Sequence, residues 1–269
     1  MKLLIIGSEG NLGSHLQEAC RCAGYTVVCA SRANIGDIDK LLRGCNAVVH
    51  AAGDVTNSVA DKVIDFTESN IMLTAKALDA CDKQGVSHFF YISSCAVYGD
   101  ASATSELKSC QPKNLNGKFK KLNEELILTF CKKKEIIPTI FRLFNLYGGH
   151  DRFSVVSNLK RCLEFNERFT LLNDGTSRRD FIHVQDAAQI ISKCLTLDKL
   201  PTVINLGTGQ TTSVKEILDV FLKLHPTISI EQRRMEEVEY SRADITILRG
   251  LLGNYHFRSV LDDVADLLV

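Results

Sequence analysis

The sequence lacks an excess of charge of either sign, because 32 lysines and arginines balance 32 aspartates and glutamates among its 269 residues. A chain without net positive charge gives no electrostatic sign of a nucleic-acid partner, and we predict none. It also lacks an apolar run long enough to span a membrane, and the apolar start, Met1 to Ile6, is too short for a signal peptide. These absences predict a cytoplasmic protein that does not enter a membrane.

Cys-x-x-Cys pairs are absent although the chain contains ten cysteines. Cys20 and Cys22 lie on one predicted helix, where they point in different directions, so we predict no metal site. Seven cysteines fall within predicted strands or helices among apolar neighbours, which indicates reduced, buried thiols rather than disulfides. These seven are Cys20, Cys29, Cys45, Cys81, Cys131, Cys162 and Cys194.

The sequence does contain a glycine-rich turn between a predicted strand and a predicted helix. The apolar run Leu3–Ile6 predicts a buried parallel strand, and three glycines follow it at intervals of three. A helix that begins after such a turn points backbone N–H groups and the positive end of its dipole at a phosphate. The first glycine allows the tight turn, the second allows the pyrophosphate to approach, and the third allows close packing of helix on strand. The predicted dinucleotide-binding residues are Gly7, Gly10, Asn11, Leu12 and Gly13.

No acidic residue stands directly after the second predicted strand, Thr26–Ala30. An acid there would bind the ribose 2′-hydroxyl of NAD. Ser31 and Arg32 instead offer a hydroxyl and a guanidinium, which suit a 2′-phosphate. We therefore predict NADP as the cofactor and NAD as the second choice. A solvated loop arginine is the alternative interpretation of Arg32.

Strands and helices alternate along the first half of the chain, which predicts an α/β fold with a doubly wound parallel sheet. In such sheets ligands bind outside the carboxyl ends of the strands. The next predicted elements are a short helix at Asp39–Arg43, a strand at Ala47–Ala51, a helix at Phe66–Cys81 and a strand at Phe89–Ser93. Further on we expect helices at Val155–Phe165, Val184–Leu197 and Val214–Leu224, and strands at Phe169–Leu172 and Val203–Leu206.

Several short motifs occur in an order that resembles the extended short-chain dehydrogenases/reductases. After the glycine turn come Asp37-Ile38, His50-Ala51-Ala52-Gly53, Asn70 and the run Ile92–Gly99; later come Arg142–Gly148, Asp174-Gly175, Arg179–Val184 and Asn205–Gly209. The chain looks like the sugar-nucleotide epimerase, dehydratase and ketoreductase branch. The resemblance covers nearly the whole chain, and it is specific for the family but not for a substrate.

The resemblance implies a Rossmann domain and a smaller C-terminal substrate-binding lobe. We place the first at residues 1–147, with a strand returning near 203–207, and the second at 148–202 and 208–269. It also implies a homodimer, formed through the helix after Asn70 and the helix that carries the active-site lysine. Leu122, Leu126 and Phe130 form an apolar stripe on the latter helix, although the stripe could instead face the chain's own sheet.

Matching positions take roles from the family. Cofactor contacts are implied for Asp37, Ile38, Ala51, Ala52, Gly53, Asn70 and Lys121. Ser94 resembles the catalytic serine and Lys121 the active-site lysine, while Asn145 and Arg179 resemble residues that hold a sugar nucleotide. Simpler roles stay open, because Ser94 could cap a strand end, Lys121 could be a solvated helix lysine, and Arg179 could pair with Asp180.

The catalytic tyrosine of the family is missing. It lies four residues before the lysine, and its phenol transfers a proton while hydride moves to or from the cofactor. Counting back from Lys121 gives Gly117, and no tyrosine lies between Tyr98 and Tyr147. The polar segment before it predicts that the catalytic helix begins near Lys118. Lys121, Cys95 and a water are the candidate replacements for the phenol.

Three functions are compatible with these residues. Cys95-Ala96 stand where dehydratases carry an Asp-Glu pair, so dehydration is not expected. The leading hypothesis is an NADP(H)-dependent oxidoreductase or epimerase that acts on a nucleotide-linked sugar, by 4-keto reduction or epimerisation, with an atypical acid/base. The alternatives are a catalytically impaired cofactor-binding protein with a regulatory or partner-subunit role, and a reductase of a non-sugar carbonyl compound.

Overall fold

The computed structural model describes residues 1–53, 63–99 and 101–266, and the chain divides into two compact units. Unit 1 contains Met1–Gly99, Lys108–Leu143 and Ala188–Ile204, and unit 2 contains Asp100–Leu107, Phe144–Ala187 and Asn205–Val269. The two largest differences from the expected boundaries are residues 100–107, which fall in unit 2, and residues 188–202, which fall in unit 1. Ser192 in the second half of α7 (Val184–Cys194) donates to the Ala19 carbonyl of unit 1 at 3.2 Å, and Thr104 donates to the Arg242 carbonyl of unit 2 at 2.8 Å.

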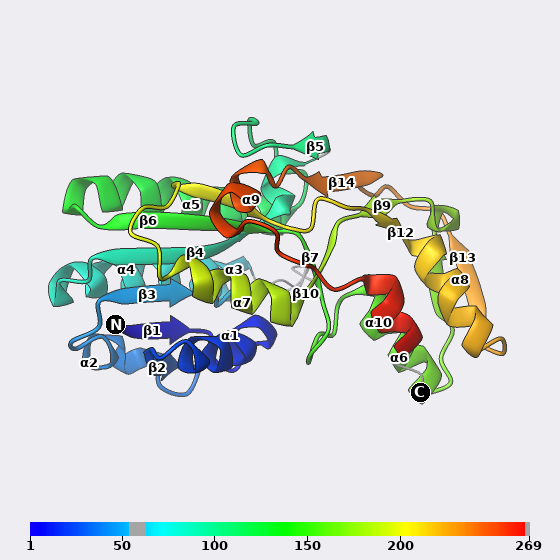
Figure 1. Cartoon of the computed structure of the whole chain (residues 1–269), viewed down its shortest axis with the longest axis horizontal. Coiled ribbons are helices and arrows are strands. Elements are labelled where there is room, and N and C mark those ends of the chain that lie inside the picture. The colour runs from blue at the N-terminus through cyan, green and yellow to red at the C-terminus, as the bar shows by residue number, and fades with distance from the viewer. Residues whose placement is uncertain (54–62, 100, 267–269) are drawn as a thin grey trace. The chain divides into compact units, whose positions relative to one another are not determined.

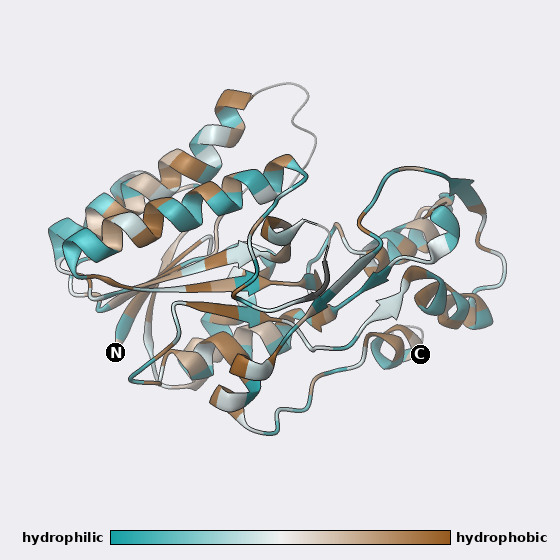
Figure 2. Cartoon of the chain, turned by 90° about the horizontal axis from the view of Figure 1, so that it is seen from above, coloured by the Kyte–Doolittle hydropathy of each residue, from teal (hydrophilic) through white to brown (hydrophobic). Residues whose placement is uncertain are grey.

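A six-stranded parallel sheet in the order β11-β6-β4-β3-β1-β2 forms the centre of unit 1 (Figure 1). Its strands are β1 (Lys2–Ile6), β2 (Thr26–Ala30), β3 (Ala47–His50), β4 (His88–Ser94), β6 (Ile137–Leu143) and β11 (Val203–Leu206). Consecutive residues Leu3 to Ile6 are all buried because helices cover both faces of the sheet (Figure 2). The predicted α/β fold with a parallel sheet is confirmed.

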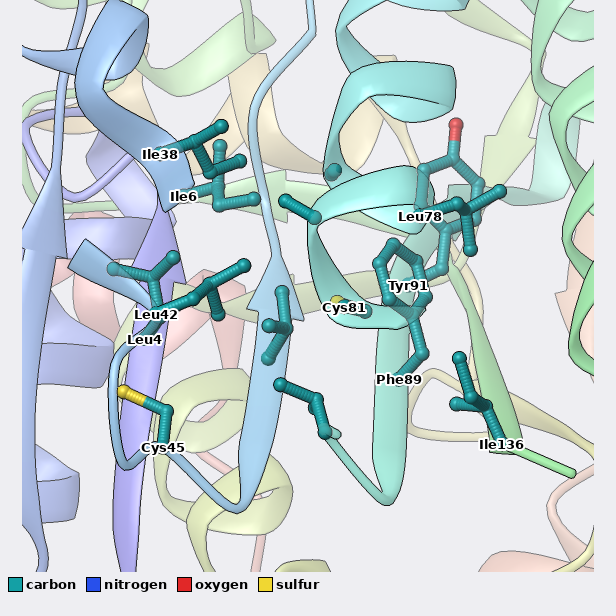
Figure 3. Close-up of a cluster of buried hydrophobic side chains, with 14 of the residues drawn as sticks. Leu4, Ile6, Ile38, Leu42, Cys45, Leu78, Cys81, Phe89, Tyr91 and Ile136 are labelled. Atoms are coloured by element: carbon teal, nitrogen blue, oxygen red, sulfur yellow. The ribbon is translucent and has the colours of Figure 1, made fainter. Parts of the chain in front are cut away.

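The helices of unit 1 are α1 (Asn11–Cys22), α2 (Ile38–Leu41), α3 (Val63–Thr67), α4 (Leu73–Gln84) and α5 (Leu115–Lys134). Residues of α2, α4 and α5 share one apolar core with alternate residues of the strands, including Leu4, Phe89 and Tyr91 (Figure 3). All ten cysteines are free, and six of the seven expected buried thiols are buried, with Cys45, Cys81 and Cys131 in this core. The prediction is wrong for Cys29, which is half-buried on β2.

Two helices of unit 1 differ from expectation. The helix expected from Phe66 is interrupted by a π-helical turn, η2 (Glu68–Met72), which joins α3 to α4. The helix expected near Lys118 begins three residues earlier, at Leu115, because the Asn114 side chain accepts a hydrogen bond from the Gly117 N–H at 2.8 Å and caps it.

Unit 2 consists of small sheets and four helices. Its strands pair as β7 (Asn145–Tyr147) with β10 (Phe181–His183), β8 (Phe169–Leu172) with β13 (Ile230–Arg233), and β12 (Thr212–Ser213), β9 (Arg178–Arg179), β14 (Tyr240–Ala243) and β5 (Ala101–Thr104) in that order. Its helices are α6 (Val155–Glu164), α8 (Val214–Leu224), α9 (Thr246–Leu252) and α10 (Val260–Asp266). A capping box of Ser213 and Glu216 opens α8. No helix in the described parts of the chain is long and apolar enough to cross a bilayer.

Candidate active site

The glycine turn between β1 and α1 has the geometry of a phosphate cradle. Gly7 adopts a φ of +85°, and a Cβ there would lie 2.7 Å from the Ala52 amide nitrogen. A Cβ on Gly13 would overlap the Gly7 carbonyl, so the helix can approach the turn only with glycine at this position. Gly10 precedes the helix in extended conformation, and its Cβ position meets only the Gly7 oxygen, at 3.2 Å. A dinucleotide pyrophosphate therefore fits the residues present.

The loop after β2 contains the two residues predicted to select the cofactor. The Ser31 hydroxyl accepts from the Ala33 N–H at 3.4 Å, and the Ser31 N–H donates to Asn34 Oδ1 at 2.8 Å. Arg32 is exposed. Next along the chain, Ile38 is 7% exposed within the apolar core, and the Asp37 carboxylate pairs with Lys40 at 2.8 Å.

Gly53, after β3, lies between two polar side chains that come from other elements. A Cβ on Gly53 would stand 2.9 Å from Asn70 Oδ1 and 3.5 Å from Lys120 Nζ. Asn70 is buried in the π-helical turn η2, where its amide nitrogen donates to the Phe66 carbonyl at 2.9 Å. Asn70 and Gly53 were both predicted from the resemblance, and the structure brings them together.

A buried histidine supports this position of Asn70. The Thr74 hydroxyl donates to the Asn70 carbonyl at 2.7 Å, so the His50 Nε2, 3.1 Å from that hydroxyl, must carry the proton of the ring. His50 Nδ1 is left as a buried acceptor without a hydrogen-bond partner among the described residues. Burial, with a smaller contribution from the charge of Lys120, lowers the pKa of His50 to about 3, so the ring is neutral at physiological pH.

The buried lysine of α5 is Lys120 and not Lys121. Lys120 is 6% exposed, and its ammonium donates to the Ile92 carbonyl at 2.7 Å and lies 4.8 Å from the centroid of the Tyr91 ring. Burial lowers its pKa to about 8, against the opposing effect of the Glu124 carboxylate. Lys121 points outward and lies 3.7 Å from Glu125 on the same helix. The candidate lysine therefore moves by one residue.

This one-residue correction also moves the position of the missing tyrosine. Four residues before Lys120 stands Asn116, whose side-chain oxygen is buried without a hydrogen-bond partner among the described residues. Gly117 instead packs on the backbone of η3 (Cys95–Tyr98), where a Cβ would overlap the Ala96 carbonyl. Helical spacing was the signal that could have found this register. Lys120, Glu124, Ile127 and Cys131 follow one buried face, which excludes Lys121.

Ser94 ends β4 and begins the turn η3. Its Oγ accepts from the Ala96 N–H at 3.1 Å, so it does cap the strand end, as the simpler interpretation suggested. The cap uses the oxygen as an acceptor, so the hydroxyl hydrogen can be donated elsewhere. Ser94 and Gly117 both contact Ala96, and Asn116 is adjacent to Gly117, so Ser94 and Asn116 lie on neighbouring segments.

A buried ion pair holds α5 against the sheet one turn beyond Lys120. Arg142 of β6 donates to both oxygens of Glu124, through Nε at 3.1 Å and Nη2 at 2.8 Å. The Ser93 hydroxyl donates to the same carboxylate, and the guanidinium lies 4.8 Å from the Tyr98 ring centroid. Burial disfavours the charged form of Arg142, but its hydrogen bonds to Glu124 outweigh this and raise the pKa of Arg142, so the guanidinium stays charged.

The two predicted substrate residues belong to unit 2. Asn145 donates from its side chain to the Asp180 carbonyl at 3.0 Å. Arg179 pairs with Glu237 at 3.1 Å and not with Asp180, whose carboxylate accepts from the N–H groups of Thr208, Gly209 and Ala243. Unit 2 also contains a cavity of about 590 Å³ between Phe181, α9 and residues 253–260, and none of the predicted site residues lines it.

Comparison with known proteins gives consistent matches. The profile of the NAD dependent epimerase/dehydratase family matches residues 3–207. A UDP-glucose 4-epimerase of Rhizobium meliloti is 26% identical over 269 residues and covers 82% of this chain and 81% of that protein. The structure of UDP-glucuronic acid 4-epimerase from Bacillus cereus with UDP-glucuronic acid and NAD has a TM-score of 0.88 at 26% identity, covering 98% of this chain and 96% of that one. MoeE5 with UDP-glucuronic acid and NAD has a TM-score of 0.90 at 25% identity, covering 98% and 97%.

The parallel sheet, the glycine turn and the buried lysine beside it define an enzyme class, the extended short-chain dehydrogenases/reductases. This chain belongs to the NAD dependent epimerase/dehydratase family. The resemblance found in the sequence is thereby confirmed, and the relatives in question are sugar-nucleotide epimerases.

Proposed function

We propose that this chain is an NADP(H)-dependent enzyme that epimerises a nucleotide-linked sugar or reduces its 4-keto form, with an acid/base other than tyrosine. The observation that carries the proposal is the convergence around Gly53 in unit 1. Asn70 Oδ1 and Lys120 Nζ flank Gly53, and Ala52 contacts the glycine turn at Gly7. These groups meet where β1 and β3 end, which is the position at which parallel sheets bind ligands.

The cofactor would be held by the cradle of Gly7, Gly10 and Gly13, with Asn11 and Leu12 at the start of α1, and by Ala51, Ala52 and Gly53 further along. When bound, its nicotinamide accepts or returns a hydride. The chain's own contribution is to position the sugar and to move the hydroxyl proton. Ser94 would donate a hydrogen bond to the reacting sugar oxygen, because the Ala96 N–H occupies one lone pair of its Oγ and leaves the hydroxyl hydrogen available.

NADP is favoured over NAD by the loop after β2. It presents the exposed Arg32 and the Ser31 hydroxyl and no carboxylate, so a 2′-phosphate would find a cation and a donor. The two relatives of known structure described above contain NAD, so a preference for NADP would distinguish this chain from them. We expect Arg32→Ala to weaken NADP at least tenfold and NAD less than twofold, measured by calorimetry. Tighter binding of NAD by the wild type would contradict the preference.

The nucleotide sugar would be held by Arg179 and Asn145. Arg179 now faces the Glu237 carboxylate, and a substrate phosphate would take over this charge-assisted contact. The relatives bind UDP sugars, which sets the first panel to test. The decisive measurement is turnover of UDP- and dTDP-sugars and their keto forms, followed by NADPH absorbance and by separation of the epimers. No turnover with cofactor demonstrably bound would refute the proposal for those sugars.

A catalytically impaired cofactor-binding protein is the second candidate, and Asn116 is the observation that favours it. An amide at the position of the family's phenol cannot exchange a proton near neutral pH. If the protein only binds, Asn116→Tyr should create turnover that the wild type lacks, since Ser94 and Lys120 are already in place. Wild-type turnover would exclude this candidate.

The site is expected to work in a cytoplasmic homodimer. Met72 next to α4 and Leu122 on α5 are 46% and 50% exposed, and they lie on the two helices implied by the family. Leu126 and Phe130, the rest of the predicted stripe, pack partly against the core of their own unit. The dimer proposal therefore rests on Leu122 and Met72 and not on the whole stripe.

A further inference from the structure

The Lys120 side chain is buried, yet the described residues offer its ammonium group few hydrogen-bond acceptors. Among the described residues it donates one hydrogen bond, to the Ile92 carbonyl at 2.7 Å, and two further N–H groups remain when it is protonated. The ionisable groups that face it are Tyr91 from β4, His50 from β3 and Glu124 from its own helix. His50 and Tyr91 are neutral at pH 7, and the Glu124 carboxylate is shared with Arg142, so among the described residues no carboxylate is reserved for the lysine.

One turn before Lys120, the amide oxygen of Asn116 is buried with no donor among the described residues. Buried acceptors in native proteins are almost always satisfied by protein or by ordered water, so this oxygen needs a donor that the described chain does not supply. Residues four apart on a helix are neighbours on the same face. The Ser94 hydroxyl, on the turn that packs against Gly117, is a third polar group beside this position.

We propose that Lys120 is the catalytic proton carrier of this enzyme, acting through a water bound to Asn116 Oδ1. This inference rests on the proposed function and specifies its atypical acid/base. In the oxidative direction the sugar O–H bond breaks and its proton passes to the water, while a proton of that water forms the new N–H bond of the neutral amine. A bound nicotinamide would supply the acceptor for the hydride that the carbon loses as its C–O bond becomes C=O. The reverse steps return the proton during reduction.

A lysine that only holds the cofactor can stay protonated throughout the reaction. A lysine that carries the proton must be a neutral amine before the sugar is oxidised, because the amine then accepts the proton. Burial lowers the pKa of Lys120 to about 8, so a useful fraction of the amine is neutral near physiological pH. Oxidation should gain about tenfold per pH unit as pH rises towards 8 and then level off. Reduction should be flat at low pH and fall above 8.

Two measurements on the full chain test this inference. The first follows the ¹³Cε resonance of Lys120 from pH 6 to 11 in the protein without cofactor, assigned by its loss in Lys120→Arg. The second follows turnover and NADP affinity of Lys120→Arg, Asn116→Ala and the wild type. Arginine keeps the positive charge and N–H donors but cannot lose a proton near neutral pH. Lys118→Arg, at an exposed position two residues away, is the matched control.

The inference predicts that Lys120 titrates near pH 8 and that the oxidative rate follows the same titration. Lys120→Arg should lose at least 100-fold in kcat with NADP affinity within threefold of wild type, and Asn116→Ala should lose about tenfold in kcat. Titration of Lys120 above pH 10, or wild-type-like turnover by Lys120→Arg, would overturn the inference while leaving the proposed enzyme intact. A wild type that binds NADP without turnover on any sugar would overturn both.

Discussion

Adjacent residues on α5 carry the same ammonium group in opposite environments. Lys121 is exposed beside Glu125, whereas Lys120 is enclosed between the Ile92 carbonyl and the Tyr91 ring. The resemblance to the family's helix placed the active-site lysine at Lys121, one residue after the lysine that α5 buries. Only the side of the helix that faces the sheet decides between them.

The burial of Lys120 predicts a stability that depends on pH. Its folded pKa of about 8 lies below the ordinary value of 10.5, so the cost of burying the charge is complete below pH 8 and is relieved as pH rises towards 10.5. Lys120→Met removes this cost. The measurement is the free energy of unfolding in urea, for the variant and the wild type at pH 7 and pH 10. The variant minus wild-type difference should be about 2–3 kcal/mol more favourable to the variant at pH 7 than at pH 10. The control is Lys118→Met. If the stability difference between Lys120→Met and wild type were equal at both pH values, the lowered pKa of Lys120 would be contradicted.

The glycine turn predicts different outcomes for two similar substitutions. Gly10→Val should fold, because Gly10 has ordinary extended angles and its Cβ meets only one oxygen, but the side chain should weaken the cofactor at least 100-fold. Gly13→Val should fail to fold, because its Cβ overlaps the Gly7 carbonyl. Thermal unfolding and NADP calorimetry separate the two effects, with Gly250→Val as a control in open space. Unchanged NADP affinity in Gly10→Val would refute the prediction that the glycine turn holds the pyrophosphate of the cofactor.

At the level of elements, α5 depends on an ion pair that lies out of water. The Glu124 and Arg142 side chains are 5% and 8% exposed, so Glu124→Ala leaves a buried guanidinium without its carboxylate. We expect a loss of about 3–5 kcal/mol in the free energy of unfolding. Glu124→Leu with Arg142→Met should recover most of it. A double-mutant cycle by urea unfolding is the measurement, and a single-variant loss below 1 kcal/mol would show that the pair contributes little.

Apolar patterns predicted most elements of the sheet well. Thr26–Ala30 and Val203–Leu206 of this sheet, and Phe169–Leu172 of unit 2, are the strands expected, since short and mostly apolar segments between polar turns leave few alternatives. The errors lie where a polar side chain decides the boundary. Asn114 starts α5 early by capping it, and the π-helical turn around Asn70 has no apolar pattern of its own. The glycine cradle was predictable from the spacing of its glycines, and the helical spacing of Lys120, Glu124 and Ile127 could have given the register of α5, which the comparison with the family's motif missed.

For the whole molecule, the exposed apolar side chains of Met72 in η2 and Leu122 on α5 predict association. Leu122 is 50% exposed on a helix implied to lie at a dimer interface, so Leu122→Glu should give a monomer in light scattering at micromolar concentration. Leu163→Glu on α6 is the matched control, because Leu163 is 40% exposed and belongs to unit 2. A monomeric wild type would rule out the dimer, and equal effects of both variants would show a general loss of solubility.

The contact between Gly117 and the Ala96 carbonyl also has a genetic consequence. A phenol cannot be introduced at 117 without moving the helix, and a glycine codon needs two base changes to encode tyrosine. The neighbouring Asn116 needs one, because AAT and AAC become TAT and TAC by a single change in the first base. The ancestral-type acid is therefore one mutation away from this gene. In a population selected for turnover of a nucleotide sugar, codon 116 is where a revertant should first appear.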